Sequence, residues 1–435
     1  MSSNNTNINY NSNMSSSTAA EPRILSSSIS SASISSETSA KAYEVITFDT
    51  FDTMGLQEDI LRGIYSYGFS TPSKIQRVAI KPMIDNHDIL AQSQSGTGKT
   101  PTFVIGSMSA VEPTLQSPQV LVLSHTRELA NQTADVAKGI GQYLKVSEKE
   151  TGIKVMTATG GTPVNEDMKA LRRGAQFIVG TPGRIFDLIK RGMNLSHLKW
   201  LVLDEADQLF EDLFADQIRE ILGTGAFPSS TKLAMFSATM PVDVLDIAER
   251  FLKDPVRILL PPEEVRLEGI KQYHVDCEQA EWKYDVLADL YKHMTINQAI
   301  IFVNKKATAE SLTHRMGKDG YTLEYIHGEM EPAERRKRMD DFRKSKVRIL
   351  IATDVLARGI DVQTVSTVIN YEMPQSRENY FHRIGRCGRF GRKGLSINLI
   401  AGAEEFAMMN DIEKHYSISI PHLPEDMSIM TSASV

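Results

Sequence analysis

Residues 87–100 read HDILAQSQSGTGKT, a short apolar run followed by a glycine-rich turn. The turn ends in Gly98-Lys99-Thr100 and matches a phosphate-binding loop, except that Ser93 stands where the first glycine of that motif is expected. Glycines let backbone N–H groups turn inward around an anion, and the N-terminus of the following helix adds a favourable partial charge. The stretch therefore predicts a nucleotide-binding site on a parallel α/β sheet, with a glycine turn before an ordinary helix as the weaker interpretation.

The side chains at the end of this loop suit a phosphate and a metal ion. Lys99 can reach the β and γ phosphates of a nucleotide, and Thr100 can ligate Mg²⁺. Pro101 is compatible with a helix start, because the first helical turn has no intrahelical partner for its missing N–H. The loop residues expected around the phosphates are Ser95, Gly96, Thr97 and Gly98.

The overall composition is that of a folded protein with more than one domain. The chain has 435 residues, of which 41% are hydrophobic and 23% charged, so it is too long for one compact core. Its 48 Lys and Arg against 54 Asp and Glu give a net charge of −6, which excludes proteins that bind polyanions through bulk charge. Any contact with nucleic acid must then use local basic patches.

Cysteine usage and hydropathy set expectations about the cellular compartment. Cys277 and Cys387 lie 110 residues apart without neighbouring ligand pairs, which excludes a disulfide framework and a structural zinc site. No run approaches ~18 apolar residues, and no basic segment precedes an apolar one near Met1. We therefore expect no membrane association and an intracellular location.

Composition also divides the chain into segments. Residues 1–40 contain 15 Ser and 6 Asn and cannot bury enough apolar area to fold, so they are predicted to form a disordered tail. Residues 41–260 and 270–435 each alternate short β-branched runs with amphipathic stretches, as parallel sheets flanked by helices do. Residues 261–269 begin with two prolines and two glutamates, which stop regular structure and predict a linker.

The expected strands are short and nearly all apolar, as strands buried on both faces of a parallel sheet are. In the first lobe they cover residues 87–91, 120–124, 177–180, 200–203 and 233–237. In the second lobe they cover residues 299–303, 323–326, 348–352, 367–371 and 395–400. The predicted fold class is therefore α/β, with two domains built on the same pattern.

One of these strands runs directly into a group of carboxylates. Residues 200–207 read WLVLDEAD, so Asp204 and Glu205 follow a buried strand. Asp204 can hold Mg²⁺ through water, and Glu205 can orient or deprotonate an attacking water. An isolated acidic cluster is more often a solvated strand end, but the phosphate-binding loop upstream favours the catalytic interpretation.

Further motifs give the chain a family resemblance. Residues 204–207 (DEAD), 237–239 (SAT) and 382–389 (HRIGRCGR) resemble the motifs of DEAD-box ATP-dependent RNA helicases and occur in the order of that family. The resemblance implies two tandem RecA-like P-loop domains that use ATP and Mg²⁺. Within the family, the chain is most similar to the eukaryotic translation initiation factor 4A group, and the nuclear exon-junction relative stays open as an alternative. The segments that carry this closer similarity are residues 63–69, 267–272 and 389–394.

The resemblance assigns roles around the nucleotide. Gln76 and Phe51 occupy the adenine-reading positions, although from the residues alone Gln76 would be a helix-surface residue and Phe51 a core residue. Asp361 is expected to bind the ribose. Arg386 and Arg389 are expected to contact the γ-phosphate as arginine fingers, whereas charge alone suits a solvated basic loop equally well. The residues expected to couple nucleotide and lobe closure are Ser237, Thr239 and Arg358.

The same resemblance implies RNA binding without sequence preference, through phosphates and 2′-hydroxyls. The implied contacts are Arg127, Gly160, Gly161, Thr181, Gly183 and Arg184 in the first lobe and Phe302, Arg335 and Thr353 in the second. The chain departs from the family at Ser93, at His125 in place of a proline, and at Pro332 in place of an RNA-contacting glutamine. We expect the changes at His125 and Pro332 to weaken the affinity for the strand.

The predicted function is RNA-stimulated ATP hydrolysis coupled to local unwinding of RNA duplexes in translation initiation. Two alternatives stay open, namely an ATP-dependent RNA clamp that serves as a scaffold in nuclear RNA processing, and a DNA-directed helicase. The implied partners are RNA and scaffold or regulatory proteins of the translation machinery. We expect a monomer in the cytoplasm, with the nucleus as the alternative location.

Overall fold

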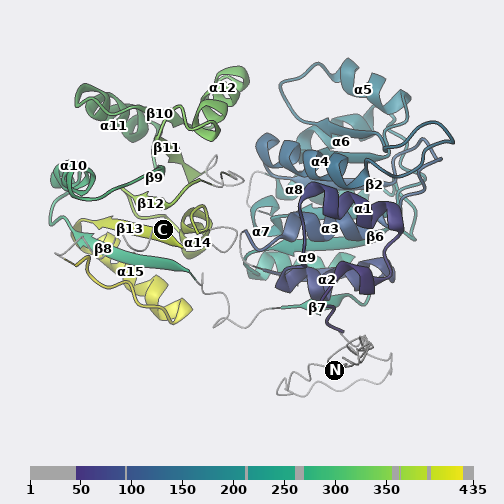
Figure 1. Cartoon of the computed structure of the whole chain (residues 1–435), viewed down its shortest axis with the longest axis horizontal. Helices are drawn as coiled ribbons and strands as arrows, with labels where there is room; N and C mark the ends of the chain where they lie inside the picture. The colour runs from purple at the N-terminus through teal and green to yellow at the C-terminus, as the bar shows by residue number, and fades with distance from the viewer. Residues whose placement is uncertain are drawn as a thin grey trace, which may run out of the picture.

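The chain forms two α/β lobes that lie side by side (Figure 1). The computed structural model describes residues 46–93, 96–210, 214–259, 269–354, 362, 364–388 and 393–424. Each lobe is built on one parallel sheet, so the predicted α/β class is confirmed. The predicted tail lies outside the described residues, as does the predicted linker apart from Gly269.

The first sheet has seven parallel strands in the order β3-β4-β2-β5-β6-β1-β7. Their bounds are β1 Ile89–Gln92, β2 Val120–Ser124, β3 Val155–Ala158, β4 Phe177–Gly180, β5 Trp200–Asp204, β6 Lys232–Ser237 and β7 Val256–Ile258. The second sheet has six parallel strands in the order β10-β11-β9-β12-β13-β8. Their bounds are β8 Ile270–Asp276, β9 Ala299–Val303, β10 Leu323–Ile326, β11 Ile349–Thr353, β12 Thr367–Asn370 and β13 Gly394–Ile400.

Helices connect these strands and cover the sheets. In the first lobe they are α1 Glu58–Tyr67, α2 Lys74–Ile84, α3 Lys99–Met108, α4 Arg127–Gly141, α5 Val164–Arg172, α6 Pro182–Lys190, α7 Ala206–Leu209, α8 Ala215–Gly223 and α9 Val242–Phe251. In the second lobe they are α10 Lys283–His293, α11 Lys306–Lys318, α12 Pro332–Arg343, α14 Arg377–Ile384 and α15 Gly402–Tyr416. Within the described ranges, no helix is both long and apolar enough to cross a membrane.

Each sheet has a core on both faces because successive side chains of its central strands point in opposite directions. In β2, Val120 and Val122 pack into one buried cluster, which also contains Phe103 of α3. Leu121 and Leu123 pack into a second cluster on the other face. The side chains of β9 divide between two clusters of the second lobe in the same way.

All ten predicted strands are present, and their ends differ from the prediction by no more than two residues. The structure adds β3, β7 and β8, which the sequence did not predict. All three lie at an edge of a sheet. Edge strands need not be apolar on both faces, and residues of β3 and β8 are partly exposed, so these strands lack the continuous apolar run that marked the others.

Gly63 allows α1 and α4 to approach each other closely. A Cβ atom at this position would lie 2.0 Å from the carbonyl oxygen of Ile140 in α4. That oxygen belongs to a helix backbone, so it cannot rotate away as a flexible side chain could. The glycine is therefore required by packing, and the two helices would have to separate to admit any side chain.

We expect Gly63→Ala to lower the free energy of unfolding by about 1–3 kcal/mol, because the added methyl group overpacks the contact between the two helices. Chemical denaturation followed by circular dichroism measures this loss. The matched control is Gly223→Ala at the end of α8, where no atom lies within 4 Å of an added Cβ. That control should be neutral or stabilising by up to about 1 kcal/mol, and equal losses in both variants would contradict the packing argument.

Candidate active site

The phosphate-binding loop connects β1 to α3 and ends in a conformation that favours glycine. Gly98 has a φ of +97° at the N-cap of α3, and a Cβ atom there would lie 2.8 Å from Nε2 of Gln76. Lys99 is buried, and its Nζ donates to the carbonyl oxygen of Ser93 at 2.5 Å. The hydroxyl of Ser93 lies 2.5 Å from Oγ1 of Thr97, so the serine that replaces the first glycine is bonded within the loop.

The carboxylates follow β5, whose carboxyl end lies at the same edge of the sheet as that of β1. Asp204 is the last residue of the strand and is buried. Glu205 has a φ of +53°, a left-handed conformation that is uncommon outside glycine and costs backbone energy. Its side chain is buried, with Oε2 at 3.2 Å from Nδ1 of His125. The strained turn begins α7 and keeps both carboxylates at the edge where the phosphate-binding loop ends.

The charged groups of this edge perturb one another strongly. Burial and the neighbouring Glu205 carboxylate raise the pKa of Asp204 to about 8. Burial alone would raise the pKa of Glu205, but the neighbouring His125 and His382 side chains and the Arg386 guanidinium help to hold it below its ordinary value. Burial also lowers the pKa of Lys99. An ammonium and a carboxylate that are both poorly solvated are suited to a ligand that brings charge of both signs, such as a metal-bound phosphate.

The oxygen donors at this edge fit Mg²⁺ on a triphosphate. Oδ2 of Asp204 is buried and receives no hydrogen bond from the described residues. Thr100 follows Lys99 in the first turn of α3 and supplies a hydroxyl. Mg²⁺ is bound in such sites through one or two side-chain oxygens together with substrate phosphates. When bound, the ion would neutralise phosphate charge, and the two residues predicted to hold it are Thr100 and Asp204.

A buried hydrogen-bond network joins this carboxylate motif to the second lobe. Oδ2 of Asp207 accepts a hydrogen bond from Oγ1 of Thr239 at 2.7 Å and lies 3.0 Å from Nε2 of His382 in α14. The backbone N–H of Asp207 donates to Oγ of Ser237 at 3.2 Å. Burial alone would raise the pKa of Asp207, but these partners hold it well below its usual range. The predicted coupling residues Ser237 and Thr239 therefore contact the acidic motif directly.

The end of α14 also brings Arg386 to the site. Arg386 is buried, and its Nε donates to the carbonyl oxygen of His382 at 2.9 Å. Its positive charge contributes to lowering the pKa of Glu205 and that of Lys99, so it acts on the first lobe from the second. This placement supports the prediction that Arg386 faces the nucleotide, whereas its predicted partner Arg389 lies outside the described residues.

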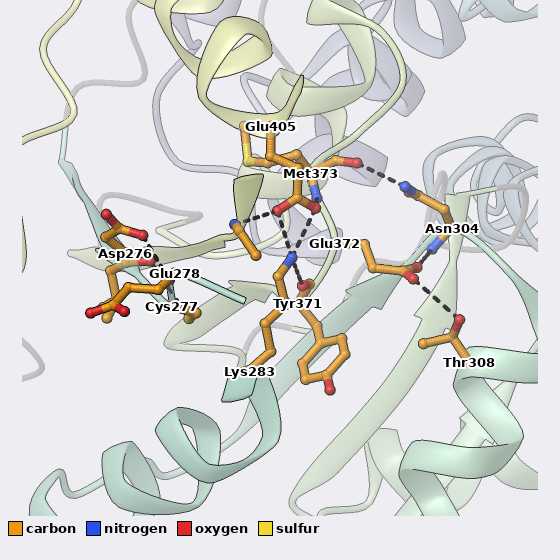
Figure 2. A network of polar contacts seen from close by, with 12 residues as sticks. Asp276, Cys277, Glu278, Lys283, Asn304, Thr308, Tyr371, Glu372, Met373 and Glu405 are labelled. Carbon is orange, nitrogen blue, oxygen red and sulfur yellow. Dashed lines mark hydrogen bonds and ion pairs between the residues drawn. The ribbon is translucent and has the colours of Figure 1, made fainter. Parts of the chain in front are cut away.

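Arg383 anchors α14 to the second sheet. Its guanidinium donates to both carboxylate oxygens of Asp354, at 2.5 and 2.7 Å. It also donates to Oδ1 of Asn304 and to the carbonyl oxygen of Glu372, each at 2.6 Å. Figure 2 shows that the Glu372 carboxylate accepts hydrogen bonds from the Asn304 backbone N–H at 2.5 Å and from Thr308 at 3.2 Å. The helix that carries His382 is thus fixed by a connected polar network, and Arg386 lies in the turn directly after that helix.

The two predicted adenine-reading residues lie in the first lobe near α2. Gln76 is buried, whereas the sequence without the family resemblance predicted a position on a helix surface. Its Oε1 accepts from the Ser73 backbone N–H at 2.8 Å, and its Nε2 lies 3.4 Å from the Gly98 carbonyl oxygen, beside the phosphate-binding loop. Phe51 has no exposed surface and packs edge-to-face on Tyr65 at 6.3 Å between ring centroids. Its stacking on a base stays a prediction that requires this ring to be uncovered.

The predicted RNA contacts of the first lobe include a cluster around Arg127. Its guanidinium lies against two of the predicted glycines. A Cβ atom added at Gly160 would lie 3.2 Å from it, and one added at Gly161 would lie 2.6 Å from it. Burial and the neighbouring cation Arg335 lower the pKa of Arg127. Guanidinium groups gathered beside exposed glycine backbone are suited to a phosphate chain.

Arg184 and its neighbours lie at the start of α6. Arg184 forms a buried ion pair with Asp167 and donates to the carbonyl oxygen of Thr162 at 2.7 Å, so it already has partners within the lobe. Thr181 is the N-cap of α6, and Gly183 belongs to the first turn. The first backbone N–H groups of a helix lack intrahelical partners and favour anions, which supports a backbone contact with a phosphate at this point.

The predicted RNA contacts of the second lobe are less accessible. Arg335 of α12 donates through Nε to Oε1 of Glu128 in α4 at 2.9 Å, and the two side chains are 10% and 13% exposed. Arg335 thus bridges the lobes instead of facing an open groove. Phe302 has no exposed surface, and its carbonyl accepts from the Tyr371 backbone N–H at 3.0 Å. Thr353 ends β11 and is also buried, so the RNA contacts of these residues stay predictions.

Four predicted site residues lie outside the described part of the chain, namely Ser95, Arg358, Asp361 and Arg389. The structure adds four residues that were not singled out, Glu128, Asp207, His382 and Arg383. Asp207, His382 and Arg383 lie within the motifs that carry the resemblance, which was a signal for them. Nothing in the sequence indicated that Glu128 would pair with a residue 207 positions away.

Comparisons with known proteins agree with this arrangement. The family description DEAD/DEAH box helicase matches residues 73–247, and Helicase conserved C-terminal domain matches residues 282–391. The ATP-dependent RNA helicase eIF4A of Chaetomium globosum is 48% identical over 383 residues, which is 88% of this chain and 94% of that protein. The eIF4A of Aspergillus oryzae is 47% identical over 387 residues, 89% of each.

The similarity extends to three-dimensional structure. S. cerevisiae Dbp5 bound to RNA and ADP BeF3 matches with a TM-score of 0.81 at 36% identity, over 89% of this chain and all of that one. The agreement covers both lobes and confirms the tandem RecA-like arrangement. With both family descriptions in order and near-half identity over most of its length, this chain belongs to the DEAD-box family of ATP-dependent RNA helicases and is closely similar to eIF4A.

Proposed function

We propose that this helicase uses one ATP to close its lobes on an RNA strand, melts a short duplex by that closure, and acts in translation initiation. The observation that carries the proposal is the bond between His382 and Asp207. It ties the acidic motif of the first lobe to α14 of the second lobe, and Arg386 lies just beyond the end of that helix. A change in the position of the acidic motif when the nucleotide binds or is hydrolysed would therefore alter the contact between the two lobes directly.

In this proposal each lobe contributes to hydrolysis. Lys99 binds the β and γ phosphates, and Glu205 orients the attacking water and accepts its proton. Arg386, together with Arg389, stabilises the charge that develops on the γ-phosphate, as an arginine supplied across a cleft does. Because two of these groups come from each lobe, hydrolysis is fast only when the lobes are closed.

RNA binding in this proposal is independent of sequence. Arg127, the backbone at Gly160 and Gly161, and the first turn of α6 would contact phosphates in the first lobe. The pair of Glu128 and Arg335 would hold the lobes together beside that strand. A strand held by its backbone on both lobes is bent when they close, which separates it from its complement.

The cellular setting is inferred from the similarity to eIF4A. It supports a role in translation initiation, in the cytoplasm, as a monomer that takes its specificity from scaffold proteins. Residues 41–260 and 270–435 would be the two functional domains, joined by residues 261–269 and preceded by a tail at residues 1–40. Mg²⁺ would accompany ATP.

Two substitutions separate nucleotide binding from hydrolysis. Lys99→Ala should weaken ATP binding by about 10–100-fold, because it removes charge-assisted hydrogen bonds to phosphate. Glu205→Gln should bind ATP normally but lower turnover by about 10²–10⁴-fold, and it should retain RNA in an ATP-dependent complex. Fluorescent-nucleotide titration and RNA retention assays measure these properties. Normal turnover by Glu205→Gln would show that the assigned roles are wrong.

The bridge between the lobes is tested by Glu128→Gln. If Arg335 serves closure through Glu128, this change should weaken RNA binding in the presence of an ATP analogue by about tenfold or more. The control is Glu334→Gln, which removes the partner of Arg338 within α12 and should have little effect. If Arg335 instead binds a phosphate directly, loss of Glu128 would free it and RNA would bind more tightly.

The open alternatives are distinguished by turnover. We expect RNA, and not DNA of the same sequence, to stimulate multiple-turnover ATP hydrolysis, and a translation scaffold protein to raise the rate further. Tight ATP-dependent retention of RNA with negligible turnover would instead indicate a clamp. Equal stimulation by DNA would indicate a DNA-directed helicase.

A further inference from the structure

His125 occupies an unexpected place beside the proposed general base. It follows β2 directly and precedes Thr126, the N-cap of α4. Its side chain is only 5% exposed, and its Nδ1 lies 3.2 Å from Oε2 of Glu205. A ring this buried faces the carboxylates and not the surface, and the expectation that His125 weakens strand affinity stays a prediction.

The parallel sheet brings these two residues together. β2 and β5 are neighbours, and in their register Ser124 lies opposite Asp204. His125 and Glu205 directly follow these two paired strand ends, so their backbones leave the sheet at adjacent points. The left-handed backbone at Glu205 then fixes the direction in which its side chain leaves the turn. The contact thus follows from the register and the turn together, not from a chance side-chain orientation.

The Glu205 carboxylate has few other partners. Its Oε2 is buried, and no other ion pair to Glu205 is found among the residues that the structure describes. Of the neighbouring side chains that lower the pKa of Glu205, His125 has the largest effect. The contact between Nδ1 of His125 and Oε2 of Glu205 is an ion pair by distance and not a hydrogen bond, because Oε2 accepts no hydrogen bond from the described residues. A carboxylate that must hold a water in one direction needs a fixed rotamer, and a buried polar ring against one of its oxygens supplies that constraint.

We propose that His125 is a positioning residue for ATP hydrolysis, which holds one oxygen of the Glu205 carboxylate so that the other faces the attacking water. The inference rests on the proposed role of Glu205. A proline, which the family carries at this place, has no side-chain donor. The anchor is therefore a property of this chain and acts on the hydrolytic step, not on the affinity for ATP or RNA.

The experiment uses three substitutions that place a donor differently. His125→Asn keeps an amide near the position of Nδ1, whereas His125→Gln is of similar size but carries its amide near the position of Nε2. His125→Leu fills the site without any donor. We expect Asn to retain a kcat within about threefold of the unaltered chain, and Gln and Leu to lose about tenfold, as expected when a polar contact with a charged group is lost.

The KM for ATP and the affinity for RNA with an ATP analogue should change by less than about twofold in all three variants, since a positioning residue acts on kcat alone. Thermal unfolding verifies that each variant is folded, and His125→Gln carries the test if His125→Leu is not. Unchanged kcat in Gln and Leu, or equal losses in Asn and Gln, would overturn the proposal. So would weaker RNA binding with unchanged kcat, which would return His125 to strand binding.

Measuring Glu205→Gln in parallel distinguishes a failure of the proposed role of Glu205 from a failure of the positioning role of His125. If that variant hydrolyses ATP at the normal rate, the proposed function of Glu205 fails regardless of His125. If it is inactive while His125→Gln is fully active, only the positioning role fails.

Discussion

The contact between His382 and Asp207 is a buried polar interaction that joins the two lobes beside the carboxylates of the candidate active site. Both side chains are buried, and together with Thr239 they satisfy a carboxylate that burial would otherwise penalise. Removing His382 would take away one of the buried partners of the Asp207 carboxylate and leave it with less compensation for its burial, so the bond stabilises the arrangement of the lobes seen here.

The second lobe supports this bond through a scaffold of its own. Arg383 uses its guanidinium to join Asp354, Asn304 and Glu372, which come from three different strand ends. Rigid support of this kind matters because catalytic groups lose efficiency when they are displaced by about 1 Å. The proposed catalytic residues therefore depend on many supporting residues. The network in Figure 2 is part of that support, because it contains Asn304 and Glu372, which Arg383 contacts.

The sequence was sufficient for the α/β class and for the central strands, and the loop and the carboxylates that it predicted as two halves of a nucleotide site lie at one edge of the first sheet. Those features depend on local signals, namely apolar runs and a loop whose glycines are needed where they stand. The edge strands β3, β7 and β8 were missed because exposure on one side removes that signal. The pair of Glu128 and Arg335 and the contact of His125 with Glu205 depend on strand register and lobe placement, which local patterns do not contain.

The hydrogen bond from Lys99 to the Ser93 carbonyl has a consequence for selectivity. The ammonium group already donates a hydrogen bond to an oxygen inside the protein. A ligand that displaces this bond must therefore form interactions with a more favourable free energy. A single small anion would merely replace one acceptor by another, with little net gain. A chain of phosphates that engages the lysine, the loop backbone and a cation at once gains on several contacts together. If Lys99 binds the phosphates as proposed, the loop would discriminate by the number of linked phosphates, and chloride or inorganic phosphate would compete poorly with a nucleoside triphosphate.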